Sequence, residues 1–274
     1  MRRELRLFFL ALQFLTRLPV PRGGVQAEFD AQSLNQAARY FALVGALVGV
    51  AGATLALLAL RLWPPTVAAT LALALTVWLT AAFHEDGLAD TFDALLGAAP
   101  REKAFSIMKD SRIGSYGAAV LVLALLLRVL LLAELLRVQP LLAAWALVLA
   151  HAAGRAAAVV LMAGLPYAGD EAHAKAKPLA RAVRPSDAAW ALSTALAVLA
   201  LGALPPAAGW PQVPLAPLAL AWCASLLLLI FVVRAWLQRR LSGFTGDTLG
   251  ACEQLGEITS LLVFVALFVR ADLS

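Results

Sequence analysis

The chain has 274 residues, of which 62% are hydrophobic and only 14% are charged, and its mean hydropathy is +0.83. Such values exclude an ordinary soluble domain and indicate a polytopic membrane protein. The net charge of +5 is carried by the segments between apolar stretches, so orientation and anionic membrane lipid explain it and no nucleic acid partner is expected. Two cysteines are too few for a disulfide framework.

Seven apolar segments come close to the ~20 residues that cross a hydrocarbon core, which predicts an all-α membrane helical bundle. We treat residues 1–274 as a single transmembrane catalytic domain. Residues 1–38 form its cytoplasmic or interfacial N-terminal part, in which an amphipathic helix is expected to lie on the membrane surface. The fifth and seventh segments are short. The predicted spans are about 40–62, 66–83, 115–136, 141–165, 188–204, 215–236 and 257–270.

Basic residues predict the orientation of the bundle, because Lys and Arg favour cytoplasmic loops. With the N-terminus in the cytoplasm, the outer side keeps only Arg61, Arg137 and Arg270. The polar segments discussed next then all face the cytoplasm.

Residues 84–93 follow the second predicted span and read His-Glu-Asp-Gly-Leu-Ala-Asp-Thr-Phe-Asp. If that span continues as a helix, three aspartates at i, i+4 and i+7 share one face. Like charges this close repel each other, and a bound cation is the usual compensation. Mg²⁺ takes carboxylate oxygens and keeps positions open for phosphate. The alternative is a set of solvated acids at a helix end. The predicted metal ligands are Glu85, Asp86, Asp90 and Asp93.

Three single residues and one loop near the spans also bear on function. His84 could bind substrate or simply hydrogen-bond at a helix end. Gly87 is expected to leave room for a ligand beside the helix backbone. Arg155 lies inside the fourth predicted span, where a lone guanidinium needs an anionic partner or ligand. The charged loop of residues 166–185 could cover a phosphate-bearing substrate, or it could be basic only because it is cytoplasmic.

Residues 108–115 form a second polar segment, just before the third predicted span. Lys109 and Arg112 could clamp phosphates, while Ser111 could cap the next helix. On these residues alone, an ordinary basic boundary is an equal alternative. Asp110 favours the functional interpretation, because an acid here is expected to be paired or to ligate.

Residues 243–257 form a third polar segment, which leads into the last predicted span. It contains Asp247, and Glu253 and Glu257 one helical turn apart. Together with residues 84–93 it holds seven of the 17 acids of the chain. We therefore expect both acidic segments to line one polar cavity at the cytoplasmic level of the membrane.

These segments resemble cobalamin synthase, the adenosylcobinamide-GDP ribazoletransferase family of membrane enzymes, over nearly the whole chain. The resemblance implies a Mg²⁺-dependent enzyme of the cell inner membrane with its active site facing the cytoplasm. α-Ribazole, or its 5′-phosphate, would attack the cobinamide-side phosphorus of adenosylcobinamide-GDP, releasing GMP and forming adenosylcobalamin or its 5′-phosphate. The matching segments are Leu12–Pro19, His84–Asp93, Ile107–Gly117, Leu165–Ala168 and Phe244–Glu257.

The resemblance also suggests roles for individual residues. Lys109 and Arg112 would stabilise charge on the transferring phosphorus and on the departing GMP, while Asp93 or Asp110 would act as general base. The expected substrate-binding residues are His84, Ser111, Arg155, Asp247, Glu253 and Glu257.

Two rival functions remain open on the sequence. The family is similar to the CDP-alcohol phosphotransferases of lipid synthesis, whose Asp-Gly step is matched by Asp86-Gly87, but Asp90 departs from their signature. A transporter would instead place acids at the midplane of several spans. Related membrane phosphotransferases are often dimeric, which leaves a homodimer open.

Overall fold

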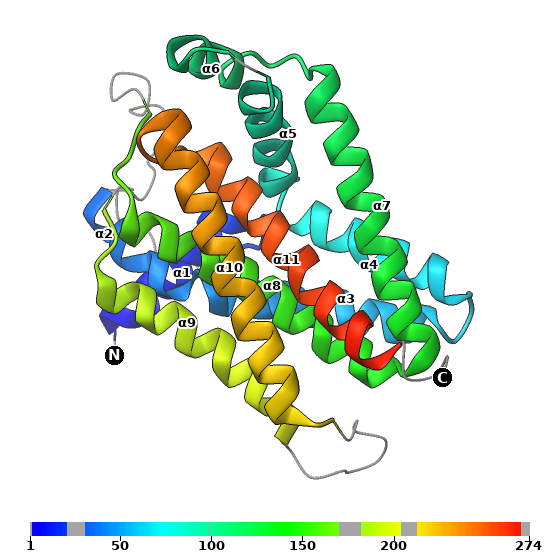
Figure 1. The fold of residues 1–274 in the computed structure, drawn as a ribbon. Helices are drawn as coiled ribbons and strands as arrows, with labels where there is room; N and C mark the ends of the chain where they lie inside the picture. The colour runs from blue at the N-terminus through cyan, green and yellow to red at the C-terminus, as the bar shows by residue number, and fades with distance from the viewer. Residues whose placement is uncertain (1, 21–30, 98, 170–181, 204–212, 270–274) are drawn as a thin grey trace.

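The computed structural model describes residues 2–20, 31–97, 99–169, 182–203 and 213–269. These residues form helices, with one isolated β-bridge between Tyr167 and Phe244 (Figure 1). The all-α prediction is confirmed. The helices are α1 Arg2–Leu15, α2 Ala31–Ala37, η1 Ala38–Tyr40, α3 Phe41–Ala59, α4 Pro65–Leu79, α5 Phe83–Leu95, α6 Arg101–Met108, α7 Ser115–Val138, α8 Pro140–Gly164, α9 Pro185–Ala200, η2 Leu201–Ala203, α10 Leu215–Leu241 and α11 Gly246–Phe268.

Five helical stretches of the described chain are long and apolar enough to cross a membrane, which confirms a polytopic bundle. The bent pair of α4 and α5 could form a sixth. This is fewer than the predicted seven, because the fifth predicted span corresponds to α9, which has only 16 residues. The last span begins at Gly246 rather than near 257. The five stretches are Gln32–Ala59, Ser115–Val138, Pro140–Gly164, Leu215–Leu241 and Gly246–Phe268.

The chain turns sharply between α4 and α5, so residues 84–93 do not continue the second span as predicted. The two helices meet at 88°, and Ala81 and Ala82 both have a positive φ, of 58° and 55°. The backbone carbonyl of Leu79, near the end of α4, accepts a hydrogen bond of 2.8 Å from the amide of Arg17. The N-terminal segment is therefore attached at the break, and α5 forms a separate arm.

Helix α8 is the centre of the bundle, and 83% of an apolar stretch of 18 residues within it is buried inside the protein. It packs against α3 and α11 through glycines, which let the helices approach closely. A Cβ on Gly49 of α3 would lie 2.7 Å from the Cα of Val148, and one on Gly256 of α11 would lie 2.8 Å from the Cα of Gly154. These contacts bring α3 and α11 close to the polar residues of α8.

Helix α1 is amphipathic, as predicted, but its apolar face packs on the protein instead of resting only on lipid. Leu7, Leu10 and Leu15 are buried in the core. The ring of Phe14 stacks on that of Phe41 in α3, with centroids 5.7 Å apart. The N-terminal helix is thus part of the bundle and reaches the polar centre described below.

One end of the bundle, in the upper part of Figure 1, gathers α6, the start of α7 and the loop between α10 and α11. Arg240 at the end of α10 donates to the carbonyl oxygens of Gly97 and Ala99, at 2.9 and 3.1 Å. The amide of Ala168 donates to the carbonyl of Phe244 at 2.8 Å. These bonds hold the polar segments together at this end.

Candidate active site

Four aspartates from two helices form what we call the aspartate cluster. Asp86, Asp90 and Asp93 share one face of α5, as their spacing predicts, and Asp247 in the first turn of α11 joins them. Asp90 is half-buried and lies close enough to the other three for their charges to oppose its own. The first and third polar segments of the sequence therefore do meet, through Asp247.

The close contact of α5 with α11 depends on glycine. A Cβ on Gly87 would lie 2.7 Å from the backbone oxygen of Asp247, and one on Gly250 would lie 3.1 Å from the backbone oxygen of His84. The prediction that Gly87 makes room for a ligand is therefore wrong, because its open side is filled by α11. Thr245 caps α11 by accepting a hydrogen bond from the amide of Thr248 at 3.3 Å.

Asp93 has a structural task within the cluster. Its Oδ2 accepts a hydrogen bond from the amide of Gly114 at 2.7 Å, and its Oδ1 accepts one from the amide of Gly117 at 2.8 Å. Asp93 thus satisfies free donors at the start of α7, the position for which Ser111 was the predicted cap. Ser111 is exposed, and α7 begins at Ser115 without a side-chain cap from its own N-cap residue.

Glu85 does not join the aspartates, although it was predicted as a metal ligand with them. Its Oε1 lies 3.2 Å from Nη1 of Arg128 in α7, and it accepts a hydrogen bond from Gln254 at 3.2 Å. The reason is helical geometry, because consecutive residues on a helix point about 100° apart. Glu85 faces the interior, and Asp86 next to it is exposed.

The two glutamates of α11 are also in the interior. Nη1 of Arg155 lies 2.5 Å from Oε1 of Glu253 and 3.1 Å from Oε1 of Glu257. Nδ1 of His151 lies 2.5 Å from Oε1 of Glu257, which also pairs with Arg128. We call this set the buried network. It consists of Glu85, Arg128, His151, Arg155, Glu253 and Glu257, each at most 6% exposed.

The buried network corrects the expectation that the acids lie at a single cytoplasmic level. Glu253 and Glu257 lie well inside α11, because that helix begins earlier than predicted. The expected anionic partner of Arg155 is confirmed, while Arg128 and His151 were missed. Arg128 lies inside the third predicted span, so it too needs an anionic partner there.

Ligand atoms of His151, Glu253 and Glu257 lie within 4.8 Å of one another, close enough to hold a metal ion. Two guanidinium groups, from Arg128 and Arg155, already pair with these carboxylates. A divalent cation would have to displace or repel them, so charge pairing accounts for this set without a metal.

The segment between α6 and α7 borders an open cavity of about 470 Å³ beside Asp93 and Tyr116. Within it, Nη2 of Arg112 lies 2.6 Å from Oδ2 of Asp110. This hydrogen bonding to Arg112 lowers the pKa of the Asp110 carboxyl to about 2. Lys109 and Arg112 are both exposed, which suits residues that contact a soluble anion.

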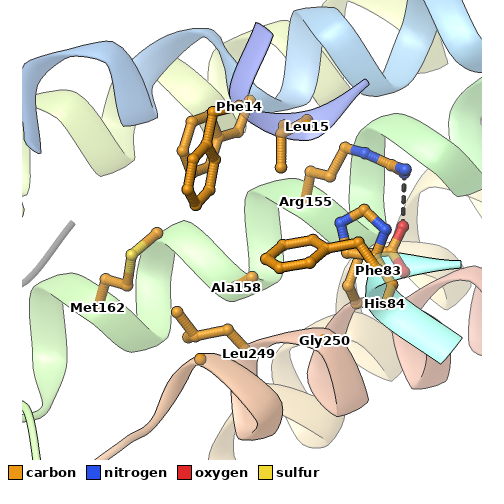
Figure 2. Close-up of a pocket in the computed structure, with 12 residues that line it drawn as sticks. Phe14, Leu15, Phe83, His84, Arg155, Ala158, Met162, Leu249 and Gly250 are labelled. Atoms are coloured by element: carbon orange, nitrogen blue, oxygen red, sulfur yellow. Dashed lines mark ion pairs between the residues drawn. The ribbon is translucent and has the colours of Figure 1, made fainter. Parts of the chain in front are cut away.

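A second pocket lies deeper, where α1, α3, α5, α8 and α11 meet (Figure 2). Three of the predicted substrate-binding residues line it, namely His84, Arg155 and Glu253. The rest of its lining is largely apolar. Of the charged loop that was predicted to cover a substrate, residues 170–181 lie outside the described residues, while Arg184 pairs with Asp187 at 3.0 Å.

Comparisons with known proteins give matches over nearly the whole chain. A scan against protein-family models matches the cobalamin-5-phosphate synthase family over residues 7–265. The chain is 49% identical to the adenosylcobinamide-GDP ribazoletransferase of Leptothrix cholodnii over 264 residues, 96% of each chain. It is 42% identical to the enzyme of that name from Shewanella amazonensis, over 98% of each chain. A search of the solved structures found no match. The chain belongs to the cobalamin-5-phosphate synthase family.

Proposed function

We propose that this chain transfers the adenosylcobinamide-phosphate moiety of adenosylcobinamide-GDP to α-ribazole, or to its 5′-phosphate, and releases GMP. The names of its relatives support this reaction. The observation that carries it is the aspartate cluster, where four carboxylates of α5 and α11 meet at one end of an apolar bundle. A reaction at a diphosphate needs neutralised charge and in-line positioning, which such a site favours.

In this proposal Mg²⁺ would bind at the aspartate cluster, with a set of ligands different from the predicted one. Asp86, Asp90 and Asp247 offer hard oxygen donors whose mutual repulsion a divalent cation would relieve. Glu85 is engaged by Arg128, and both oxygens of Asp93 accept amide hydrogen bonds. Bound Mg²⁺ would neutralise charge on the diphosphate and on the departing GMP.

Basic residues of the segment before α7 would bind the phosphates. Arg112 now holds Asp110 through Nε and Nη2, so it would exchange this carboxylate for a phosphate when substrate binds. The low pKa of Asp110 makes it a weak general base. Asp93 is the other candidate for accepting the hydroxyl proton, and the two amide hydrogen bonds at the start of α7 hold it in place, although each also occupies one of its oxygens.

The proposal places the aspartate cluster at the cytoplasmic face of the inner membrane. The support is the distribution of basic residues, since the end of the bundle that holds the cluster also carries Arg112, Arg239 and Arg240. Assembly as a homodimer stays a prediction.

The test uses the purified full chain in detergent with adenosylcobinamide-GDP, α-ribazole and Mg²⁺. GMP release and corrinoid product should both require the metal and stop with EDTA. Asp90→Asn should abolish turnover while the protein still inserts and purifies normally. Glu134→Gln, at an exposed site far along α7, is the matched control and should keep full activity. Release of CMP from a CDP-alcohol, with no reaction of the corrinoid, would contradict the proposal and favour the lipid branch.

A further inference from the structure

An aromatic pocket lies beside the aspartate cluster, and its cavity volume is about 40 Å³ (Figure 2). The rings of Phe14 and Phe41 stack with an angle of 10° between their planes. Phe83 meets Phe14 edge-on, with ring centroids 5.7 Å apart. Ala158 and Met162 of α8 line the pocket as well. The pocket therefore offers flat apolar surfaces that suit a planar ring.

The pocket has a polar side, where Arg155 and His84 lie (Figure 2), and Glu253 lines it as well. Arg155 is only 2% exposed, and its Nη1 serves the carboxylates of the buried network. Its Nε has no hydrogen-bond partner among the described residues. A buried N–H donor without an acceptor is costly, so a ligand that brings an acceptor to this side would remove that cost.

The pocket and the aspartate cluster share two helices. On α5, Phe83 of the pocket and Asp86 and Asp90 of the cluster are spaced i, i+3 and i+7, so they lie on one face. On α11, Gly250 lines the pocket three residues after Asp247. A ligand whose ring fills the pocket can therefore extend its other end along this face toward the aspartates.

We propose that this pocket binds the benzimidazole base of the acceptor α-ribazole, an inference that rests on the proposed function. The base is planar and apolar, and it carries one unsubstituted ring nitrogen that accepts a hydrogen bond. This nitrogen would face the Nε–H of Arg155, and the ribose on the other ring nitrogen would direct its 5′ end toward Asp90. Guanine, with several donors and acceptors, would find few partners here, and a lipid acyl chain would leave Nε of Arg155 unpaired.

The first test fills the pocket. Ala158→Phe should raise KM for α-ribazole at least about tenfold, because the new ring occupies the space that the base of α-ribazole would fill. KM for adenosylcobinamide-GDP should stay within about twofold, because that substrate does not use this pocket. The matched control is Ala74→Phe, at an exposed position of α4, which should change neither constant. An unchanged KM for α-ribazole in an active Ala158→Phe protein would overturn the pocket assignment and leave the proposed reaction standing.

The second test changes the substrate and uses the unmodified protein. An α-riboside of dimethylindole lacks the acceptor nitrogen and should show a KM about tenfold higher with the unmodified protein. If Ala158→Phe does not fold, Met162→Ala provides the test. It enlarges the pocket and should lower KM for a riboside of the wider naphthimidazole base relative to KM for α-ribazole. Equal KM values for all ribosides would contradict the assignment. Absence of GMP release from unmodified protein would instead refute the proposed function.

Discussion

The aspartate cluster and the buried network use the same two helices in opposite ways. Glu85 and Asp86 are neighbours on α5, yet one pairs with Arg128 in the interior and the other is exposed beside Asp90. On α11, Asp247 faces the cluster while Glu253 pairs with Arg155. Acids paired with buried guanidinium groups hold the bundle together, whereas the aspartates of the cluster repel one another, and a cation would relieve that repulsion.

The largest expected effect is on catalysis, in the aspartate cluster. Asp86→Asn should lower the rate of GMP release by at least about a hundredfold, because a metal-ligating charge is lost. The thermal midpoint of unfolding in detergent should not fall, since Asp86 is exposed and no basic side chain of the described residues forms an ion pair with it. A large fall in the midpoint would mean that the cluster is structural too, which would break the comparison.

In the buried network, the expected effect is on the stability of the fold. Arg128→Met should destabilise the protein by about 3–5 kcal/mol, because Glu85 and Glu257 would keep their buried charge without this partner. Urea or thermal unfolding in detergent measures the loss. The double variant Arg128→Met with Glu85→Gln removes one charge of each sign and should recover part of the stability. No loss in the single variant would show that the network is not needed for the fold.

A smaller effect is expected where α5 touches α11. Gly87→Ala places a methyl group 2.7 Å from the backbone oxygen of Asp247, so the helices must move apart. Overpacking of this kind costs about 1–3 kcal/mol and should displace Asp247 from Asp90. Both stability and the apparent affinity for Mg²⁺ in the activity assay should decline. Gly97→Ala, where a Cβ meets only one atom at 3.8 Å, is the control and should behave as the unmodified protein.

The smallest effect concerns pH. The pKa of Asp110 is lowered in the folded protein from 3.8 to about 2, so its pairing with Arg112 is complete above the higher value and is lost only as pH falls through the lower one. Asp110 therefore stays ionised between about pH 5 and 9. Asp110→Asn should leave the shape of the rate profile in that range unchanged. If the rate profile of Asp110→Asn lost its acid limb, Asp110 would be identified as the general base.

The sequence by itself determined the class of fold and the groups that matter. High hydropathy predicted a helical membrane bundle, and the i, i+4, i+7 spacing placed three aspartates on one face, because both depend only on local composition and helical periodicity. The lone Arg155 in an apolar span indicated a buried anion for the same reason.

Only the tertiary structure decided which acids pair with which bases. The turn at Ala81 and Ala82 and the earlier start of α11 depend on long-range contacts, such as the bond from Arg17 to Leu79, that no local pattern encodes. These two features move Glu253 into the interior and decide what each face of α5 meets, so that Glu85 pairs with Arg128 while Asp86 is exposed. A helix shows its periodicity in the sequence, but the partner that each of its faces meets is set by packing among segments far apart in the chain.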